Sequence, residues 1–196
     1  LTAELGPDPF GAKSYPQTTA CVYPLGTLLH IAPGNMPGLP VYTALEGLLT
    51  GNINLVKLPH GDKGLSLAAF RLLVEQEPKL ASYLYAFDLP AKEKEDLQAL
   101  ANLADGIVTW GGDGAIQAAR TLAGAGCKLI EWGHRLSFAY LSGYEDRERE
   151  LSALAAHIIG TGQRLCSSCQ VIFLDTDSRG EAETFCKIFL PYLEEA

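Results

Sequence analysis

Short runs of apolar residues alternate along the chain with segments in which apolar residues recur every three or four positions. A short apolar run is typical of a buried strand, and the longer spacing is typical of an amphipathic helix. The runs predict strands over residues 27–32, 53–58, 83–88, 106–110, 128–132, 137–141 and 171–175. The helical spacing predicts helices over residues 39–49, 65–76, 91–104, 113–123, 148–159 and 179–194.

This alternation predicts the fold class. Nearly continuous apolar strands separated by helices indicate an α/β protein whose parallel sheet is covered on both faces. We therefore expect a doubly wound parallel sheet, that is, a Rossmann-like cofactor domain. Ligands of such sheets bind at the carboxyl ends of the strands. Function is thus expected in the loops after Ala32, Leu58, Trp110 and Trp132.

Two domains are expected. Residues 1–133 would form the nucleotide cofactor-binding domain, and residues 134–196 would form part of an α/β catalytic domain. The chain opens on Leu1 rather than methionine and ends within a helical pattern, which suggests a piece of a longer protein.

Composition excludes several classes of partner and location. A net charge of -8 disfavours a nucleic-acid partner, which needs a basic surface. No apolar run is long enough to span a membrane, and the chain does not open on a signal peptide. Five scattered cysteines indicate reduced thiols and a cytoplasmic protein. The four histidines are too dispersed to predict a metal site.

The turn PGNMPG begins at Pro33 and joins a predicted strand to a predicted helix. Its Asn35 amide and the N–H groups at the helix start could bind an anion or an oxyanion. The alternative is an ordinary turn in which Asn35 caps the helix.

Two further turns follow predicted strands. Lys57 lies at an apolar strand end and is either a cofactor contact or a snorkelling surface lysine. His60, three residues later, is either a polar contact to the same ligand or a solvated histidine. Gly111 and Gly112 could let the backbone approach a dinucleotide, although G-x-G-x-x-G is absent. The alternative there is a tight turn.

Glu131 is a carboxylate in an apolar strand end, either ion-paired or tuned by desolvation into a general base. Cys166 and Cys169 form a C-x-x-C pair, which could be a redox dithiol, half of a metal site, or a nucleophile with a bystander. A redox dithiol is typically found at a helix start after a strand, whereas this pair precedes a predicted strand.

Taken in order, these stretches resemble the aldehyde dehydrogenase superfamily, and most closely its LuxC-type acyl-CoA reductases. The resemblance runs from about Tyr23 to the end of the chain. The quoted motifs are YPLGTLLHIAPGNMPGLPVYTALEGLLTGNINLVKLP, TWGGDGAI, LIEWG and GQRLCSSCQVIF. It implies an oxidoreductase that reduces an acyl-CoA thioester to the aldehyde through a cysteinyl acyl-enzyme.

The resemblance implies a role for each matching residue. Cys166 would be the nucleophile, and Asn35 would form the oxyanion hole with the Cys166 N–H. Glu131 would stand where the family carries its general base. The cofactor-binding residues would be Pro33, Lys57, His60, Gly111 and Gly112. Cys169 would be a bystander, or would form a reversible disulfide that protects Cys166.

Departures from the family pattern refine these expectations. His60 stands where many NAD-preferring members carry a glutamate, so we expect NADP(H), with NAD(H) as the alternative. The gap between Gln163 and Cys166 is one residue longer than in ordinary aldehyde dehydrogenases, which favours the acyl-CoA reductase branch. Partners would be an acyl-CoA or aldehyde substrate, a second copy of the full-length protein, and acyl-transfer subunits. The alternatives are aldehyde oxidation, including CoA-acylating oxidation, and a non-catalytic scaffold homologue.

Overall fold

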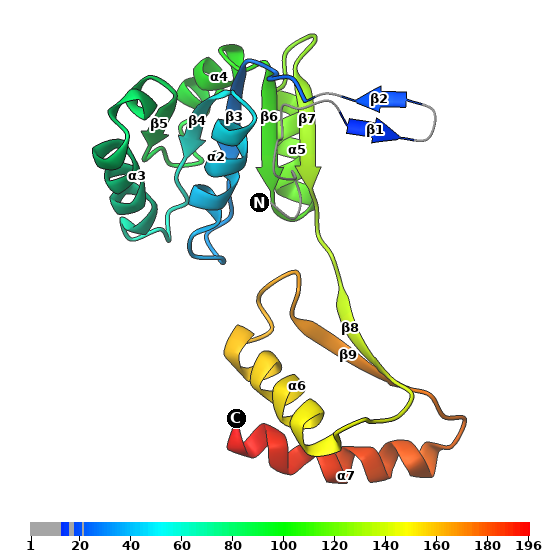
Figure 1. Cartoon of the computed structure of the whole chain (residues 1–196). Coiled ribbons are helices and arrows are strands. Elements are labelled where there is room, and N and C mark those ends of the chain that lie inside the picture. Colours follow the sequence, from blue (N-terminus) through cyan, green and yellow to red (C-terminus); the bar gives the residue numbers. More distant parts are fainter. Residues whose placement is uncertain (1–12, 16–17, 21) are drawn as a thin grey trace. The chain divides into compact units, whose positions relative to one another are not determined.

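A computed structural model describes residues 13–15, 18–20 and 22–196 of the chain (Figure 1). The chain divides into two compact units, one ending at Gly133 and one running from His134 to Ala196. The two units are described one after the other.

The first unit is built on five parallel strands in the order β5-β4-β3-β6-β7 (Figure 1). Numbered along the chain, this order is 3-2-1-4-5, so the sheet is wound outward in both directions from β3 and β6. The doubly wound parallel sheet predicted from the sequence is confirmed. The strands are β3 (Thr27–Ile31), β4 (Ile53–Lys57), β5 (Leu84–Phe87), β6 (Gly106–Trp110) and β7 (Lys128–Trp132).

Helices cover both faces of this sheet because successive strand residues point to opposite faces. On one face, Leu29, Leu55 and Ile107 pack with α4 (Lys94–Asn102) and α5 (Asp113–Leu122). On the other face, Val56 and Leu84 pack with α2 (Leu39–Leu49) and α3 (Leu65–Gln76).

Three short elements in the first unit were not predicted. The strands β1 (Lys13–Tyr15) and β2 (Thr18–Ala20) pair antiparallel, and the 3-10 helix η1 (Pro78–Ser82) precedes β5. The two strands are only three residues long and mostly polar (KSY and TTA), and the 3-10 helix PKLAS is less than two turns long, so none of them shows an apolar run or a helical period along the chain.

The second unit contains the parallel strand pair β8 (Ser137–Leu141) and β9 (Cys169–Leu174). The helices α6 (Arg147–Thr161) and α7 (Arg179–Glu195) pack on one face of this pair, with Leu151, Ala155 and Phe189 at the centre. Both helices begin at a side-chain cap: Asp146 accepts from the Arg149 N–H at 3.1 Å, and Ser178 accepts from the Glu181 N–H at 3.4 Å.

A buried hydrogen-bond network joins β3, β4 and α2. His30 Nδ1 lies 2.9 Å from Thr43 Oγ1, and His30 Nε2 lies 2.8 Å from Asn54 Oδ1. The Asn54 amide nitrogen donates to the carbonyls of Asn52 and Tyr83, so Asn54 Oδ1 is left to accept from the His30 Nε2–H. Neutral His30 therefore satisfies both of its ring nitrogens, although the ring is 1% exposed.

The network also explains the glycine in the last turn of α2. A Cβ on Gly47 would lie 1.8 Å from Asn54 Oδ1 and 3.2 Å from His30 Nε2. Any side chain here would push α2 off the sheet and separate the network, so the helix carries glycine despite its low helix propensity.

The buried histidine predicts a loss of stability in mild acid. Burial lowers the pKa of His30 to about 4 from an ordinary value of 6.5, against the opposing effect of its bond to Asn54. The unfolded chain therefore binds the proton more readily than the folded chain between these values. The contribution of neutral His30 to the free energy of unfolding is fully present above the unfolded pKa of 6.5. It falls as the pH drops toward 4, by up to about 1.4 kcal/mol per pH unit, because unfolding takes up one proton.

Urea unfolding at a series of pH values measures this slope. His30→Gln is expected to flatten the slope, whereas His157→Gln, which changes an exposed histidine, is expected to leave it in place. An equal effect of the two variants would contradict the assignment to His30.

Candidate active site

Most of the predicted site residues lie in the loops that follow the parallel strands, at the carboxyl end of the sheet in the first unit. This end of the sheet is called the edge of the first unit below. Pro33 and Asn35 follow β3, His60 follows β4, and Gly111 and Gly112 follow β6. The loops after β3 and β4 touch, since a Cβ on Gly61 would lie 3.3 Å from the Gly34 carbonyl oxygen. Parallel pairing brings these segments together although they are distant in the sequence.

The turn after β3 does not use Asn35 as a helix cap. The N-cap of α2 is Gly38 in the left-handed conformation, with φ 83°, and no side chain caps the helix there. Asn35 is therefore not the N-cap residue of α2; it is exposed and lies in the turn three residues earlier.

Lys57 ends β4 and is half-buried. Burial lowers the pKa of the Lys57 ammonium, and the nearby carboxylate of Asp88 opposes that shift. Asp88 follows β5 directly, where the Leu58 N–H donates to the Phe87 carbonyl at 2.8 Å. Asp88 was not among the predicted site residues, although it is a charged residue at the end of the predicted strand 83–88.

The turn after β6 suits close approach of a phosphate. A Cβ on Gly111 would lie 2.9 Å from the Ala115 Cβ, so a side chain does not fit there. A Cβ on Gly112 would meet nothing within 4 Å, and this residue is the N-cap of α5. Open backbone at a helix N-terminus fits the pyrophosphate of a dinucleotide, although Asp113 adds a carboxylate in the first turn.

Two tryptophans stand at the same edge. Trp110 ends β6 and Trp132 ends β7, and they are directly paired across the two strands. Their rings are stacked, with centroids 4.7 Å apart and planes 12° from parallel. The Trp110 indole N–H also donates to Thr43 Oγ1 at 3.4 Å. From the sequence alone, both residues were predicted only as strand ends.

Glu131 is ion-paired. The Arg120 guanidinium of α5 donates to both carboxylate oxygens, from Nε at 2.6 Å and from Nη2 at 2.7 Å. These hydrogen bonds from Arg120 lower the pKa of the Glu131 carboxyl, with burial acting in the opposite direction. Of the two alternatives raised by the sequence, the structure shows the ion pair and no rise of the pKa by desolvation.

Cys166 belongs to the second unit and lies on a hydrogen-bonded turn between α6 and β9. The Ser168 N–H donates to the Leu165 carbonyl at 3.0 Å, and the Leu165 N–H donates back to Ser168 Oγ at 2.9 Å. Ser137 of β8 donates to the Cys166 carbonyl at 2.7 Å, and His157 Nε2 lies 2.9 Å from the Ser167 carbonyl oxygen. The thiol of Cys166 is thus exposed on a turn with a well-fixed backbone.

Cys169 differs from Cys166 in its surroundings. It is buried, begins β9, and its thiol donates to the Val171 carbonyl at 3.4 Å. The pair lies on a helix-to-strand connection, as predicted, and not at a helix start after a strand. Among the described residues, no group of three or more histidine, cysteine, aspartate or glutamate side chains could hold a metal ion.

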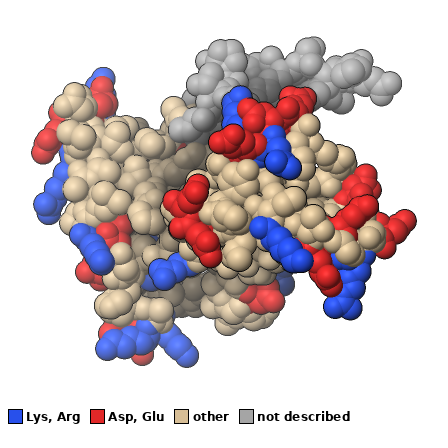
Figure 2. All heavy atoms as spheres, turned by 90° about the horizontal axis from the view of Figure 1, so that it is seen from below, with Lys and Arg blue, Asp and Glu red and all other residues tan. Residues whose placement is uncertain are grey.

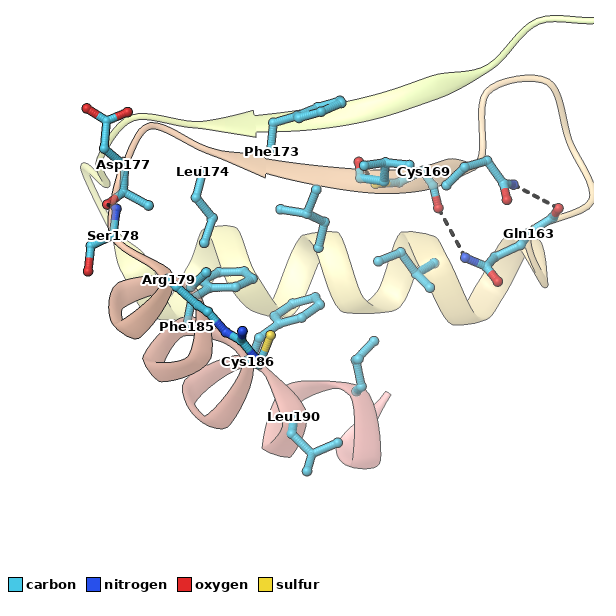
Figure 3. A pocket seen from close by; sticks show the side chains of 18 residues that line it. Gln163, Cys169, Phe173, Leu174, Asp177, Ser178, Arg179, Phe185, Cys186 and Leu190 are labelled. Atoms are coloured by element: carbon cyan, nitrogen blue, oxygen red, sulfur yellow. Dashed lines mark hydrogen bonds between the residues drawn. The ribbon is translucent and has the colours of Figure 1, made fainter.

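A pocket of about 710 Å³ opens beside β9, α6 and α7 in the second unit (Figure 3). Its wall is largely apolar, and Gln163 lies at one end. The Gln163 side-chain amide donates to the Cys169 carbonyl, and the Gln163 backbone carbonyl accepts from the Gln170 side-chain amide. Within the described part of the chain, β9 pairs with β8 alone, so the pocket lies against a free strand edge.

The surface agrees with the acidic composition. Figure 2 shows lysine and arginine side chains scattered among aspartate and glutamate on the face in view. Such interspersed charge does not form the basic stripe that a nucleic-acid partner requires. In the part of the chain that the structure describes, no helix is long and apolar enough to cross a membrane.

Comparison with known families gives one match to most of the chain. A family model described as acyl-CoA reductase (LuxC) matches residues 10–195. The long-chain acyl-protein thioester reductase of Vibrio harveyi is 28% identical over 191 residues, which are 92% of this chain and 39% of the relative. The enzyme of the same name from Aliivibrio fischeri is 25% identical over 158 residues, which are 79% of this chain and 33% of the relative. The chain therefore spans well under half of these relatives.

Solved structures share the fold. The propionaldehyde dehydrogenase of Rhodopseudomonas palustris with bound propionyl-CoA superposes with a TM-score of 0.70 at 16% identity, over 94% of this chain and 40% of that chain. The succinic semialdehyde dehydrogenase of Streptococcus pyogenes in complex with NADP+ gives a TM-score of 0.69 at 16% identity, with the same coverage. The α/β architecture is that of aldehyde dehydrogenase-type domains.

The ion pair of Glu131 yields a direct prediction. Because Arg120 lowers the pKa of this carboxyl, Arg120→Met is expected to raise it toward the usual range for glutamate. Carboxyl-carbon NMR titration of Glu131 measures the change. Arg179→Met, which breaks the surface pair with Glu183, is the matched control and is expected to leave the titration of Glu131 unchanged. Equal pKa values for Glu131 in the native chain and in Arg120→Met would contradict the account.

Proposed function

The chain belongs to the acyl-CoA reductase (LuxC) family, and from this premise we propose that it takes part in reducing an acyl thioester to an aldehyde through an acyl-enzyme on Cys166. The observation that carries the proposal is the exposed thiol of Cys166 on a turn fixed from both β8 and α6. The two curated relatives described above are both called long-chain acyl-protein thioester reductases.

The proposed chemistry has two steps. The Cys166 thiolate attacks the thioester carbonyl carbon, and the bond from that carbon to the leaving thiol breaks, which leaves the acyl group on Cys166. A reduced nicotinamide supplies a hydride to that acyl carbon when it is bound. The bond to Cys166 then breaks, and a proton returns to the thiol as the aldehyde leaves.

Asn35 is proposed to stabilise the oxyanion together with the Cys166 backbone N–H. A donor of this kind is worth about 3 kcal/mol in acyl transfer. The exposed position of Asn35 in the loop after β3, at the carboxyl end of the sheet, supports this role, because ligands of such sheets bind there. The role itself comes from the family resemblance.

The edge of the first unit is proposed to hold the dinucleotide. Lys57 would contact the adenosine ribose, with Pro33 and His60 beside it, and Gly111 and Gly112 would lie against the pyrophosphate. The open backbone after β6 supports this assignment. Solved neighbours include complexes of other enzymes with NADP+ and with NAD+. We propose NADP(H), because His60 stands where NAD-preferring members of the superfamily carry a glutamate.

The ion pair of Glu131 favours reduction over oxidation. Oxidation of an aldehyde to an acid needs a base that activates water, whereas release of an aldehyde does not. A carboxylate held by both of its oxygens on Arg120 is poorly placed to accept a proton from water. Glu131 is therefore proposed to play a minor part in the reaction.

The acyl group could arrive on coenzyme A or on a partner protein. Both carry the same thioester carbonyl, so the attack by Cys166 is chemically equivalent for the two donors. The relatives from Vibrio harveyi and Aliivibrio fischeri are acyl-protein thioester reductases by name, which fits acyl-transfer subunits as partners.

The proposal predicts a covalent adduct. After incubation with a panel of acyl-CoA esters and no nucleotide, peptide mass spectrometry is expected to find roughly one acyl group per chain, on Cys166. Cys166→Ala is expected to abolish the adduct. Cys186→Ala removes another exposed free thiol and is expected to leave the adduct intact.

Two outcomes would contradict this function. One is the absence of an adduct on every cysteine of the folded protein. The other is acylation of Cys186 to the same extent as Cys166, which would indicate unselective thiol chemistry and support a non-catalytic homologue.

The charges near Lys57 act on the relative affinity for NADPH and NADH, and Asp88 opposes the proposed preference for NADP(H). The Asp88 carboxylate acts on Lys57 and would repel a 2′-phosphate on the ribose. Asp88→Asn is thus expected to raise the affinity for NADPH relative to NADH by roughly 3- to 10-fold, and His60→Glu to lower it. Equilibrium dialysis measures both ratios. Equal affinity of the native chain for the two nucleotides would overturn the preference for NADP(H). An unchanged ratio of NADPH to NADH affinity in Asp88→Asn would show that Asp88 does not act on this preference.

A further inference from the structure

The two tryptophans of the chain lie against each other at the edge proposed to hold the cofactor. Trp110 and Trp132 are the only tryptophans among the 196 residues. They end adjacent parallel strands, are paired in register, and stack with their centroids 4.7 Å apart. Trp132 is nevertheless 40% exposed, so the stack is open to solvent on at least one side.

Packing alone does not account for this pair. Neither tryptophan belongs to the two core clusters of the first unit. The Trp110 indole N–H reaches Thr43 of α2, so its ring lies on the α2 face of the sheet. On that face α2 packs mainly on β3 and β4 and reaches β6 through Thr43, whereas α4 and α5 lie on the opposite face of the sheet. The pair therefore forms an open aromatic wall at the carboxyl end of the sheet.

The orientation of the wall is fixed from within the core. Thr43 Oγ1 accepts from the Trp110 indole and also lies 2.9 Å from His30 Nδ1. The buried network of His30 thus continues to the surface through Thr43 and ends on Trp110. A side chain held in this way is pre-organised, which is what a binding residue requires.

The position of the wall in the doubly wound sheet indicates its ligand. A dinucleotide lies across the point where the strand order reverses, with one mononucleotide on each half of the sheet. That point lies between β3 and β6 here. Lys57 and His60 belong to the half formed by β3, β4 and β5 and were proposed above for the adenosine end. The other half, with β6 and β7, is left for the nicotinamide end.

We propose that the stacked pair of Trp110 and Trp132 binds the nicotinamide ring of the cofactor by aromatic stacking, a role that rests on the cofactor site proposed above. The oxidised ring is planar and positively charged, and an indole face attracts both a flat aromatic ring and a cation. Trp110 positions the wall through Thr43, and Trp132 offers the more exposed ring.

Tryptophan fluorescence tests the contact directly, because both emitters of the chain are in the wall. NADP+ is expected to quench the emission of the native chain, and it does not absorb in the range where tryptophan emits. ADP-ribose 2′-phosphate is the same ligand without its nicotinamide ring, and it is expected to bind without quenching. Equilibrium dialysis measures the affinity for both ligands independently of fluorescence.

Three variants sharpen the test. Trp132→Leu is expected to weaken NADP+ binding roughly 3- to 10-fold and to leave the affinity for ADP-ribose 2′-phosphate unchanged. Trp132→Phe keeps an aromatic face and is expected to restore much of the affinity. Tyr85→Leu removes a comparably exposed aromatic ring from β5, which is the outer strand farthest from β7 in the strand order. This variant is expected to change neither affinity.

The outcomes separate this inference from the function on which it rests. If the native chain binds neither ligand in dialysis, the proposed cofactor site is overturned, and the inference with it. If NADP+ binds without quenching and with equal affinity in Trp132→Leu, only the inference is overturned. A loss of ADP-ribose 2′-phosphate binding in Trp132→Leu would place the adenosine end on the wall and would overturn the assignment to nicotinamide.

Discussion

The hydrogen bonds of His30 are the interaction on which the first unit depends. A neutral imidazole at 1% exposure is tolerated only because Thr43 and Asn54 satisfy both of its nitrogens. These three side chains come from β3, α2 and β4, so their bonds fix the positions of the elements that carry the proposed cofactor loops. Gly47 belongs to the same constraint, since it lets α2 come close enough for Thr43 to reach the ring. Hydrogen bonds inside the core thus position the loops that follow β3 and β4, which are the loops proposed to hold the cofactor.

Much of the fold followed from the sequence because hydrophobic period is a local property. The strands ending at Trp110 and Trp132 and the helix 39–49 were predicted with the bounds that the structure shows. Each lies between glycine, proline or polar residues that end it in a recognisable way. The strand order and the β1–β2 hairpin were beyond this reasoning, the first because it depends on long-range pairing and the second because its strands have three residues each.

The candidate site, like the fold, could be predicted from the sequence only where its features are local. Lys57 could be identified because it is a charged residue at the end of an apolar strand, whereas Asn35 and Cys166 lie in loops next to strands and took their roles from the family resemblance. Their partners could not be identified in this way: Arg120 lies 11 residues before Glu131, on the preceding helix, and Ser137 lies 29 residues before Cys166. The tryptophan wall is a clear case, because only the register of β6 and β7 reveals that Trp110 and Trp132 stack.

The central proposal is that hydride from a reduced nicotinamide reaches an acyl group on Cys166. The most direct measurement uses protein that has been acylated in advance, freed of excess thioester, and mixed with NADPH carrying deuterium at the transferable position of the nicotinamide. The account predicts an aldehyde with one deuterium on its carbonyl carbon, formed as the adduct on Cys166 disappears. Unlabelled aldehyde, free acid, or an adduct that persists with NADPH bound would contradict it.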